Sequence, residues 1–419
     1  SVIICGGVII IMILIAVIIV AATGSGQSEE ERVEQEIRKL IQNELPTATL
    51  SAEAVDWVVE QRLADTTSYP DQRLFSQYSL VAFYLSTSGK GMEFVKKNWM
   101  AGIENECGWY GVTCDETDAV VFLEMASSNL TGTIPPDIGM LSNSLSNLDL
   151  GNNLLSGLLP PEIGYLSVLE KLDVRDNLLS QKIPTDMGNL VLLEDLYLQE
   201  NSFLGPLPSE LGMMSSIRTW NMSNNNVFDK IPKSLWQGVS LRNLEFLDLS
   251  QNLLSGEGST DFAKFGSSWD KLTSLRLGNN FLRGNDLQNT IAVNLAKLEE
   301  LDLSSNFFSG TVPDELFDMT NLKILNFAKS GIFVASDILN LITSNLLSLE
   351  ELDLSGCNID GSIPTQIGLL KQMQSIKLDS NKFNGVIPTE IGLLNKLKSI
   401  SLYQNFLRGE IPTDIALLK

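Results

Sequence analysis

The sequence of 419 residues contains no histidine at all. This absence excludes the usual Ser/His/Asp and Cys/His catalytic arrangements, histidine general bases, and zinc sites built on imidazole. Basic residues are also few, with 29 Lys and Arg against 51 Asp and Glu. The resulting formal net charge of −22 is spread along the chain and disfavours nucleic acid as a partner. We therefore expect no catalytic residues, no metal site and no cofactor.

Cysteine is scarce too, and its placement is informative. Only Cys107 and Cys114 are close in sequence, so we expect no metal cluster and take this pair as the candidate disulfide. Cys5 lies in an apolar tract, and Cys357 falls on a repeat position, described below, where a small buried side chain is tolerated. A disulfide would require an oxidising compartment.

One long apolar run opens the chain. Residues 2–22 carry no charge, and about 21 residues at about 1.5 Å each span roughly 31 Å, the thickness of a bilayer core. We predict a single transmembrane helix over residues 1–22. A secretory signal peptide is the alternative, but its apolar region would be about 7–15 residues behind a basic leader. The flank GSGQSEEER lacks the basic residues of a cytoplasmic side, so we expect later residues to be extracellular or lumenal.

An acidic segment follows the predicted span. Val33, Ile37 and Ile41 recur at helical spacing, which favours short amphipathic helices, although a solvated, partly disordered stalk is the alternative. From Leu74 the run LFSQYSLVAFYLST more firmly predicts a helix that leads into the cysteine pair. We therefore divide the chain into a span, a juxtamembrane stem, an N-terminal cap and a repeat region, at residues 1–22, 23–72, 73–118 and 119–419.

From Leu123 the pattern LxLxxNxLxGxIPxxIGxL recurs to the end of the chain. The residue at its Asn position returns every 24 to 28 residues and is asparagine in nine of twelve units. The twelve positions are Ser128, Asn153, Asn177, Asn201, Asn225, Asn252, Asn280, Asn306, Ser330, Cys357, Asn381 and Asn405. Twelve units in register predict an array in which each unit buries its leucines only against its neighbours.

Each position of the pattern has a physical reason. The two leucines of LxL point inward from a short strand while the intervening residue points outward. The Asn side chain can satisfy backbone groups in the turn that leaves the strand. Proline ends the extended segment because it lacks a donor, and PTEIGLL or PPEIGYL predicts a short helical or 3₁₀ return. The predicted fold is a right-handed α/β repeat solenoid with a parallel concave sheet.

The LxGxIPxxIG form resembles the plant-type leucine-rich repeats of receptor-like kinases, receptor-like proteins and polygalacturonase inhibitors. The resemblance covers residues 119–419 and extends upstream, where Trp99, Cys107, Trp109 and Cys114 match the N-terminal cap W…CxWxGVxC of that family. With an N-terminal span and an acidic stem, the whole chain more loosely resembles membrane-anchored diatom repeat proteins. The resemblance implies a non-enzymatic recognition role.

The end of the array and its middle are irregular. IPTDIALLK closes the sequence without a capping motif, and Ser1 is not a methionine, so we expect a piece to be missing at each end. The units around residues 256–272 and 284–298 lose the IP element, and the run after Ser330 predicts a longer helix. These units could form an island that contacts a ligand, but drift in repeat length is the simpler interpretation.

The outward residue of each LxL should form a ladder along the concave sheet. With about 4.8 Å between strands, twelve strands extend roughly 53 Å. The predicted rungs are Glu124, Asp149, Asp173, Tyr197, Asn221, Asp248, Arg276, Asp302, Asn326, Asp353, Lys377 and Ser401. Six are acidic, which favours a cationic or hydroxyl-rich partner anchored by Tyr197, Arg276 and Tyr403. Alternatively, the Asp of LDLS only makes the surface soluble.

Two glycosylation acceptors fit the Asn-x-Ser/Thr pattern, Asn129 and Asn221. Asn129 should be accessible just beyond the first turn. Asn221 lies on the ladder itself, where a glycan would obstruct the concave face.

Three functions remain open. The first is a membrane-anchored receptor-like or adhesion protein whose concave face binds a protein, a peptide or a cell-wall glycan, with signalling that would need a co-receptor. The second is a glycanase inhibitor or surface-adsorbing protein. The third, an enzyme with paired carboxylates on the ladder, is disfavoured because an open sheet excludes water poorly.

Overall fold

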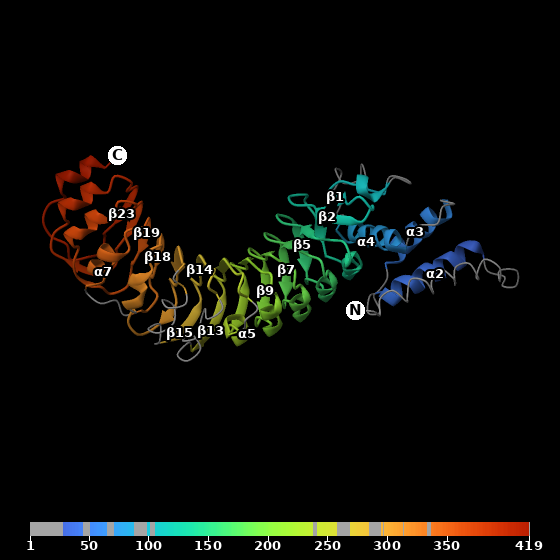
Figure 1. The fold of residues 1–419 in the computed structure, drawn as a ribbon, viewed down its shortest axis with the longest axis horizontal. Coiled ribbons are helices and arrows are strands. Elements are labelled where there is room, and N and C mark those ends of the chain that lie inside the picture. The colour runs from blue at the N-terminus through green and yellow to red at the C-terminus, as the bar shows by residue number, and fades with distance from the viewer. Residues whose placement is uncertain are drawn as a thin grey trace.

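The structure is a computed structural model that describes residues 28–44, 51–64, 71–87, 99–100, 105–237, 241–257, 269–284, 295, 297–312, 314–332 and 337–418. In this part of the chain the repeats stack in sequence order along one curved row (Figure 1). Helices lie at the N-terminal end of the row, and the C-terminal repeat lies at the other end. The predicted solenoid is therefore confirmed.

One sheet runs through the whole array and lines its concave side. Its strands follow chain order, and all neighbours are parallel except β1, which pairs antiparallel with β2. The strands are β1 (Val112–Cys114), β2 (Val120–Glu124), β4 (Asn147–Asp149), β6 (Lys171–Asp173), β8 (Asp195–Tyr197), β10 (Thr219–Asn221), β12 (Phe246–Asp248), β14 (Ser274–Arg276), β16 (Glu300–Asp302), β18 (Ile324–Asn326), β19 (Glu351–Asp353), β21 (Ser375–Lys377) and β23 (Ser399–Ser401). The parallel strands correspond one to one with the twelve predicted repeats.

A second sheet, which the sequence analysis did not anticipate, forms just after the Asn turns. The eight strands of this sheet are also parallel and in chain order: β3 (Thr131–Gly132), β5 (Leu154–Gly157), β7 (Leu178–Gln181), β9 (Ser202–Gly205), β11 (Asn226–Asp229), β13 (Leu253–Glu257), β15 (Phe281–Gly284) and β17 (Phe307–Phe308). Near the C-terminus β20 (Asp360–Ser362) and β22 (Lys382–Asn384) form a separate pair.

Short helical turns return the chain from the second sheet to the first. They are η3 (Pro136–Leu141), η4 (Pro161–Tyr165), η5 (Thr185–Asn189), η6 (Ser209–Met213), α5 (Lys233–Gln237), η9 (Asp314–Asp318), α7 (Ile338–Asn345), η10 (Thr365–Leu369), η11 (Thr389–Leu393) and η12 (Thr413–Leu417). Most follow a proline, whose fixed φ suits the start of such a turn. The longer helix predicted after Ser330 is confirmed as α7. The irregular units at 256–272 and 284–298 lie mostly outside the described residues.

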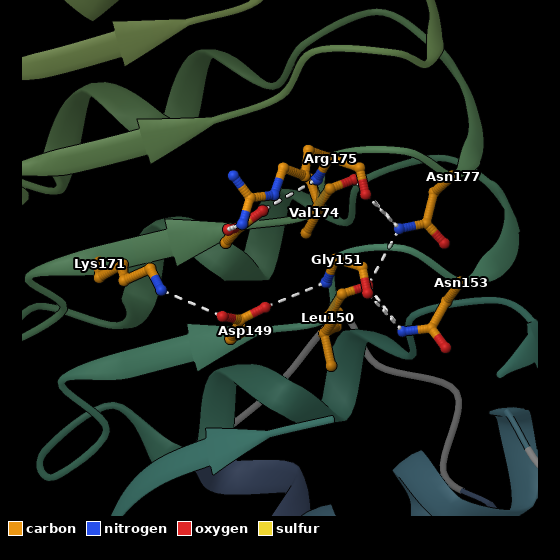
Figure 2. A network of polar contacts seen from close by, with 9 residues as sticks. Asp149, Leu150, Gly151, Asn153, Lys171, Val174, Arg175 and Asn177 are labelled. Atoms are coloured by element: carbon orange, nitrogen blue, oxygen red, sulfur yellow. Dashed lines mark hydrogen bonds and ion pairs between the residues drawn. The ribbon is translucent and has the colours of Figure 1, made fainter. Parts of the chain in front are cut away.

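Buried asparagines form hydrogen bonds that join each turn to the neighbouring repeat (Figure 2). The Asn177 side chain accepts a hydrogen bond from the backbone N–H of Leu155 in the preceding repeat, at 2.9 Å. Its amide group donates back to the carbonyls of Leu150, Val174 and Arg175 at 3.0–3.2 Å. This pattern explains why asparagine, with both a donor and an acceptor, recurs at this position. At one of the three exceptions, the Cys357 thiol lies 3.0 Å from the carbonyl of Phe327.

The N-terminal end is closed by three helices, α2 (Glu29–Glu44), α3 (Ala52–Ala64) and α4 (Asp71–Thr87). The helix predicted from Leu74 is confirmed as α4, which packs against η3 of the first repeat. Although we assigned α2 and α3 to the stem, the structure packs α2 on α3 and α3 on α4, with Ile37, Ile41 and Val55 buried between them.

The predicted disulfide is present, with Cys107 and Cys114 joined and their Cα atoms 5.4 Å apart. It ties the turn before β1 to that strand. Beside it, the rings of Trp99 and Trp109 lie 5.1 Å apart, and Trp57 of α3 packs edge-on against Trp109 at 5.9 Å. The cap therefore covers the leucine core with aromatic rings from both α3 and the cysteine loop.

No helix within the described ranges is long and apolar enough to cross a bilayer. The span predicted at residues 1–22 lies outside these ranges.

Candidate ligand-binding surface

The outward residues of the LxL motifs do form a ladder. Backbone pairing places Glu124 beside Asp149, Asp149 beside Asp173, and so on in unbroken register to Lys377 and Ser401. Because a parallel sheet in register stacks equivalent residues, every rung predicted from the sequence occupies the position expected for it.

The aspartates of the ladder have a structural task that the sequence analysis missed. Asp248 Oδ1 accepts hydrogen bonds from the backbone N–H and the hydroxyl of Ser250, at 2.9 and 2.6 Å. Asp353 makes the same two contacts with Ser355, at 3.0 and 2.7 Å. Each aspartate thus caps the turn that leaves its strand, as short polar side chains do in Asx turns. The serine of LDLS was the signal for this role.

Several carboxylates are consequently withdrawn from solvent. The expectation that every rung is exposed is wrong for Asp173 and Asp248, which are 0% and 4% exposed. Burial, together with the charge of Asp149, raises the pKa of Asp173 above its ordinary value, although Arg175 and Lys171 oppose the shift. Burial also raises the pKa of Asp302. The acidic ladder therefore presents less negative charge to a ligand than its sequence suggests.

Cations from a neighbouring strand or from the turn that follows neutralise much of the remaining charge. Lys171 Nζ lies 3.0 Å from Asp149 Oδ2, and Arg175 Nη2 lies 3.3 Å from Asp173 Oδ2 (Figure 2). Burial opposes the charged form of Lys171, but its hydrogen bond to Asp149 prevails and raises the pKa of Lys171. Lys377 Nζ pairs with Asp353 Oδ2 at 3.2 Å.

Arg276, which we predicted as a ligand anchor, is held by both neighbouring strands. Its Nε and Nη2 donate to the two carboxylate oxygens of Glu300 at 2.7 and 3.0 Å. Its Nη1 lies 3.6 Å from Asp248 Oδ2, and its guanidinium lies 5.5 Å from the centre of the Phe246 ring. Arg276 thus clamps β12, β14 and β16 together while keeping about two-fifths of its side chain exposed.

The groups left most open lie toward the two ends of the concave face. Near the cap, Glu124 is exposed and the Phe122 side chain beside it is 38% exposed. Near the C-terminus, the Lys377 side chain is 53% exposed and Tyr403 is 63% exposed. Between them, Tyr197 is half-buried under the Arg175 guanidinium, 5.4 Å from its ring centre.

Phe122 and Arg175 escaped the sequence analysis because they flank the outward residue of LxL. Phe122 lies two residues before its rung on the same face of β2, so the two-residue period of a strand could have identified it, whereas Arg175 lies in the turn after β6.

The glycosylation acceptors differ in their surroundings. Asn129 is exposed just before β3, with a left-handed φ of 52°. Asn221 is half-buried on the ladder, where its Oδ1 accepts from the N–H and hydroxyl of Ser223 at 3.0 and 2.8 Å. Glycosylation remains a prediction at both, and the geometry favours Asn129.

Metal ligands do not gather in the part of the chain that the structure describes: no three His, Cys, Asp or Glu side chains are placed there to hold an ion.

Five segments match the Leucine Rich Repeat family: residues 144–166, 168–190, 243–265, 297–319 and 348–370. Toll-like receptor 2 of Mus musculus is 36% identical over 120 residues, 29% of this chain and 14% of that receptor. Receptor-like protein 39 of Arabidopsis thaliana is 33% identical over 143 residues, 34% of this chain and 15% of that protein. The chain thus spans only a small part of these curated relatives.

Among solved structures, the crystal structure of PEPR1-AtPEP1 is similar with a TM-score of 0.62 and 30% identity, covering 80% of this chain and 49% of that one. Together with the family matches, this similarity confirms that the chain is built of leucine-rich repeats and resembles plant-type receptor-like proteins.

Proposed function

Because the chain is a leucine-rich-repeat solenoid similar to receptor-like proteins, we propose that it is a non-enzymatic recognition protein whose concave face binds an extended peptide or protein segment. In this proposal residues 1–22 anchor it in a membrane and the repeats lie on the extracellular or lumenal side. A disulfide in the cap supports an oxidising compartment.

One observation carries the choice of ligand: the exposed groups of the concave face are polarised along it. Glu124 and Phe122 lie at the cap end, and Lys377, which also pairs with Asp353, and Tyr403 lie at the other, while the aspartate rungs between them are buried, paired with a cation or capping their own turns. Glu124 and Lys377 are ten strands apart, roughly 48 Å at about 4.8 Å per strand. An extended segment of about 14 residues covers that length.

Charge complementarity then specifies the ligand further. A basic side chain should lie over Glu124, and an acidic side chain or a terminal carboxylate over Lys377. Phe122 and Tyr403 offer aromatic surface at both ends, as expected of interface anchors. In this proposal Arg276 and the buried aspartates hold neighbouring strands and turns together between these ends rather than contacting charge on the ligand.

Selection of peptides from a random library on the purified full chain, followed by titration calorimetry, tests this proposal. Lys377→Gln and Tyr403→Ala should each weaken the selected peptide about tenfold, near 1.4 kcal/mol. Lys396→Gln is the matched control, because Lys396 is exposed on the return side of the same part of the array. Equal loss from all three variants would refute an oriented concave site.

The same protein, presented to a glycan array and to glycanases, separates the alternatives. Binding of cell-wall glycans without any selected peptide, or inhibition of a glycanase, would replace the proposal with the adsorbing or inhibitor function. A co-receptor would be sought only after a peptide has been found.

A further inference from the structure

The second sheet carries an uninterrupted row of exposed apolar side chains. Each of its seven strands from β5 to β17 presents one large residue to solvent, between 37% and 56% exposed. We call this set the second-sheet row: Leu154, Leu178, Leu204, Phe228, Leu253, Phe281 and Phe307. The row crosses six strand spacings, roughly 29 Å at about 4.8 Å each.

The row is maintained where the repeat pattern drifts. In most of these strands the apolar residue directly follows the residue at the Asn position of the repeat. In β9 and β11 that place is polar, Ser202 and Asn226, and the apolar residue stands two positions later, as Leu204 and Phe228. Two positions along a strand is the same face, so the row stays on that face, although the register places Leu204 opposite Lys182 rather than opposite Leu178. Phe228 pairs directly with Leu253, and the rings of Phe281 and Phe307 stack 5.9 Å apart.

The row also has two polar ends. On the cap side the equivalent strand β3 presents Thr131, preceded by the glycosylation acceptor Asn129. On the other side the equivalent positions are Gly331, which has no side chain, and then Asn358 and Lys382, all three exposed. Exposed apolar residues scattered singly need no explanation, but a bounded row of seven marks an interaction surface.

The area of the row fits a dimer interface. Seven side chains that are each about half exposed present roughly 500–600 Å² of apolar surface, if a full aromatic side chain offers about 150–250 Å². That is the upper end of the largest apolar patch on a typical monomer, about 300–600 Å². A standard interface buries about 800 Å² per partner, of which about 56–65% is apolar. The row therefore supplies the apolar core of one such interface, with its polar flanks as the rim.

We propose that the second-sheet row is covered by the same row of a second copy of this chain, related by a two-fold axis near Phe228. The order of residues carries this choice: leucines occupy the cap end and phenylalanines the other end. A two-fold axis reverses one row against the other, so Leu154 meets Phe307 and Leu178 meets Phe281 of the second copy. The rings of Phe281 and Phe307 then each face a leucine, and the two Phe228 rings meet at the axis, with the two sheets about 10 Å apart.

Charge in the neighbourhood of the row permits this packing. Lys182, Asp229 and Arg283 are exposed beside it, so the rim carries both signs. The whole chain nevertheless has a net charge of −22, and two copies repel each other at long range. The dimer should therefore strengthen as salt rises toward about 0.5 M, whereas a contact made by ion pairs would weaken.

Cysteine crosslinking of the full chain in detergent tests the arrangement, in a background of Cys5→Ser. Cys357 is buried, and burial raises the pKa of its thiol to about 11, so it should not react. Phe228→Cys should give a disulfide-linked dimer alone, because it lies near the axis. Leu154→Cys and Phe307→Cys should crosslink when the two variants are mixed and at least tenfold less when either is alone. Leu393→Cys is the matched control: Leu393 is 48% exposed on the return side.

Each outcome of these experiments either supports or overturns the proposed dimer. Crosslinking in this pattern, together with a concentration-dependent dimer in sedimentation that Phe281→Ser and Phe307→Ser abolish, supports the proposal. A monomer at tens of micromolar with no crosslink from Phe228→Cys overturns it. So does quenching of a probe at Phe228→Cys by labelled lipid in vesicles, which would show that a membrane covers the row. Peptide binding on the concave face is independent of either result.

Discussion

Replacing Asn177 with alanine should loosen the junction between two repeats without touching the concave surface. The side chain is 6% exposed, and its amide joins the backbone of the repeats that contain Leu150 and Val174. Alanine can adopt the same backbone conformation at this position, but its side chain has no polar atoms. The buried N–H of Leu155 then loses its partner, whereas the carbonyl of Leu150 retains the side-chain amide of Asn153.

The cost follows from the N–H of Leu155. Leaving a buried donor unsatisfied costs about 1–3 kcal/mol. At about 1.4 kcal/mol per factor of ten, the amide of Leu155 should exchange roughly 5- to 150-fold faster. Because neighbouring repeats share their stability, protection should fall most in the adjacent repeats and little near the C-terminus.

Hydrogen exchange read by mass spectrometry on peptides covering residues 145–180, with chemical denaturation alongside, measures both effects. Asn189→Ala is the matched control, because Asn189 is exposed in η5 of the same region. Asn177→Asp should destabilise the chain more than Asn177→Ala at neutral pH, since a carboxylate would face three carbonyls. This loss of stability should shrink as the pH falls and the carboxylate is protonated. Cys357→Asn should be tolerated, because it restores the usual amide beside the carbonyl of Phe327.

The reasoning would be refuted if Asn177→Ala exchanged and unfolded like the native chain within about 0.5 kcal/mol. It would also fail if Asn189→Ala showed an equal loss, since the effect would then come from asparagine content and not from the bonds between repeats.

Two further predictions concern the cap. Cys107→Ser with Cys114→Ser removes the bond that closes the loop before β1, which should destabilise the cap by about 2.5 kcal/mol; faster exchange in β1 and β2, with unchanged exchange near β21, would confirm a local effect. Tyr78→Phe removes the 2.6 Å hydrogen bond to buried Asp137 and should cost about 2–3 kcal/mol in thermal unfolding. Burial, and then the contact with Asp137, raises the pKa of Tyr78, so the native chain should lose stability as pH rises above about 10, and the variant should lose less. Burial also raises the pKa of Asp137, and the Tyr78 hydrogen bond opposes this shift. The variant should therefore lose more stability than the native chain as the pH rises from about 4 to about 7.

Much of the candidate surface was accessible from the sequence because a repeat converts spacing into position. The LxL motif fixed which residue of each unit faces outward, and parallel register then placed Asp149, Asp173 and Lys377 where expected. The period did not reveal how exposed those residues would be. Whether an aspartate contacts solvent or caps its own turn depends on the backbone two residues later, as with Asp248 and Ser250.

The second sheet and its apolar row were missed for a related reason. After the Asn turn each unit contributes only two to five residues to that sheet, too short for alternation to stand out in one repeat. Only stacking reveals that Leu204 and Phe228, shifted by two positions, continue the line begun by Leu154 and Leu178.

The sequence by itself determined the solenoid, the number of strands in its concave sheet and the cap disulfide, because these depend on local patterns repeated at a fixed interval. Tertiary structure alone decided which carboxylates are buried, how Arg276 is clamped between Glu300 and Asp248, and that α2 and α3 pack onto the cap. These outcomes depend on contacts formed only in the folded chain, whose strength is set by distance and burial rather than by spacing in the chain.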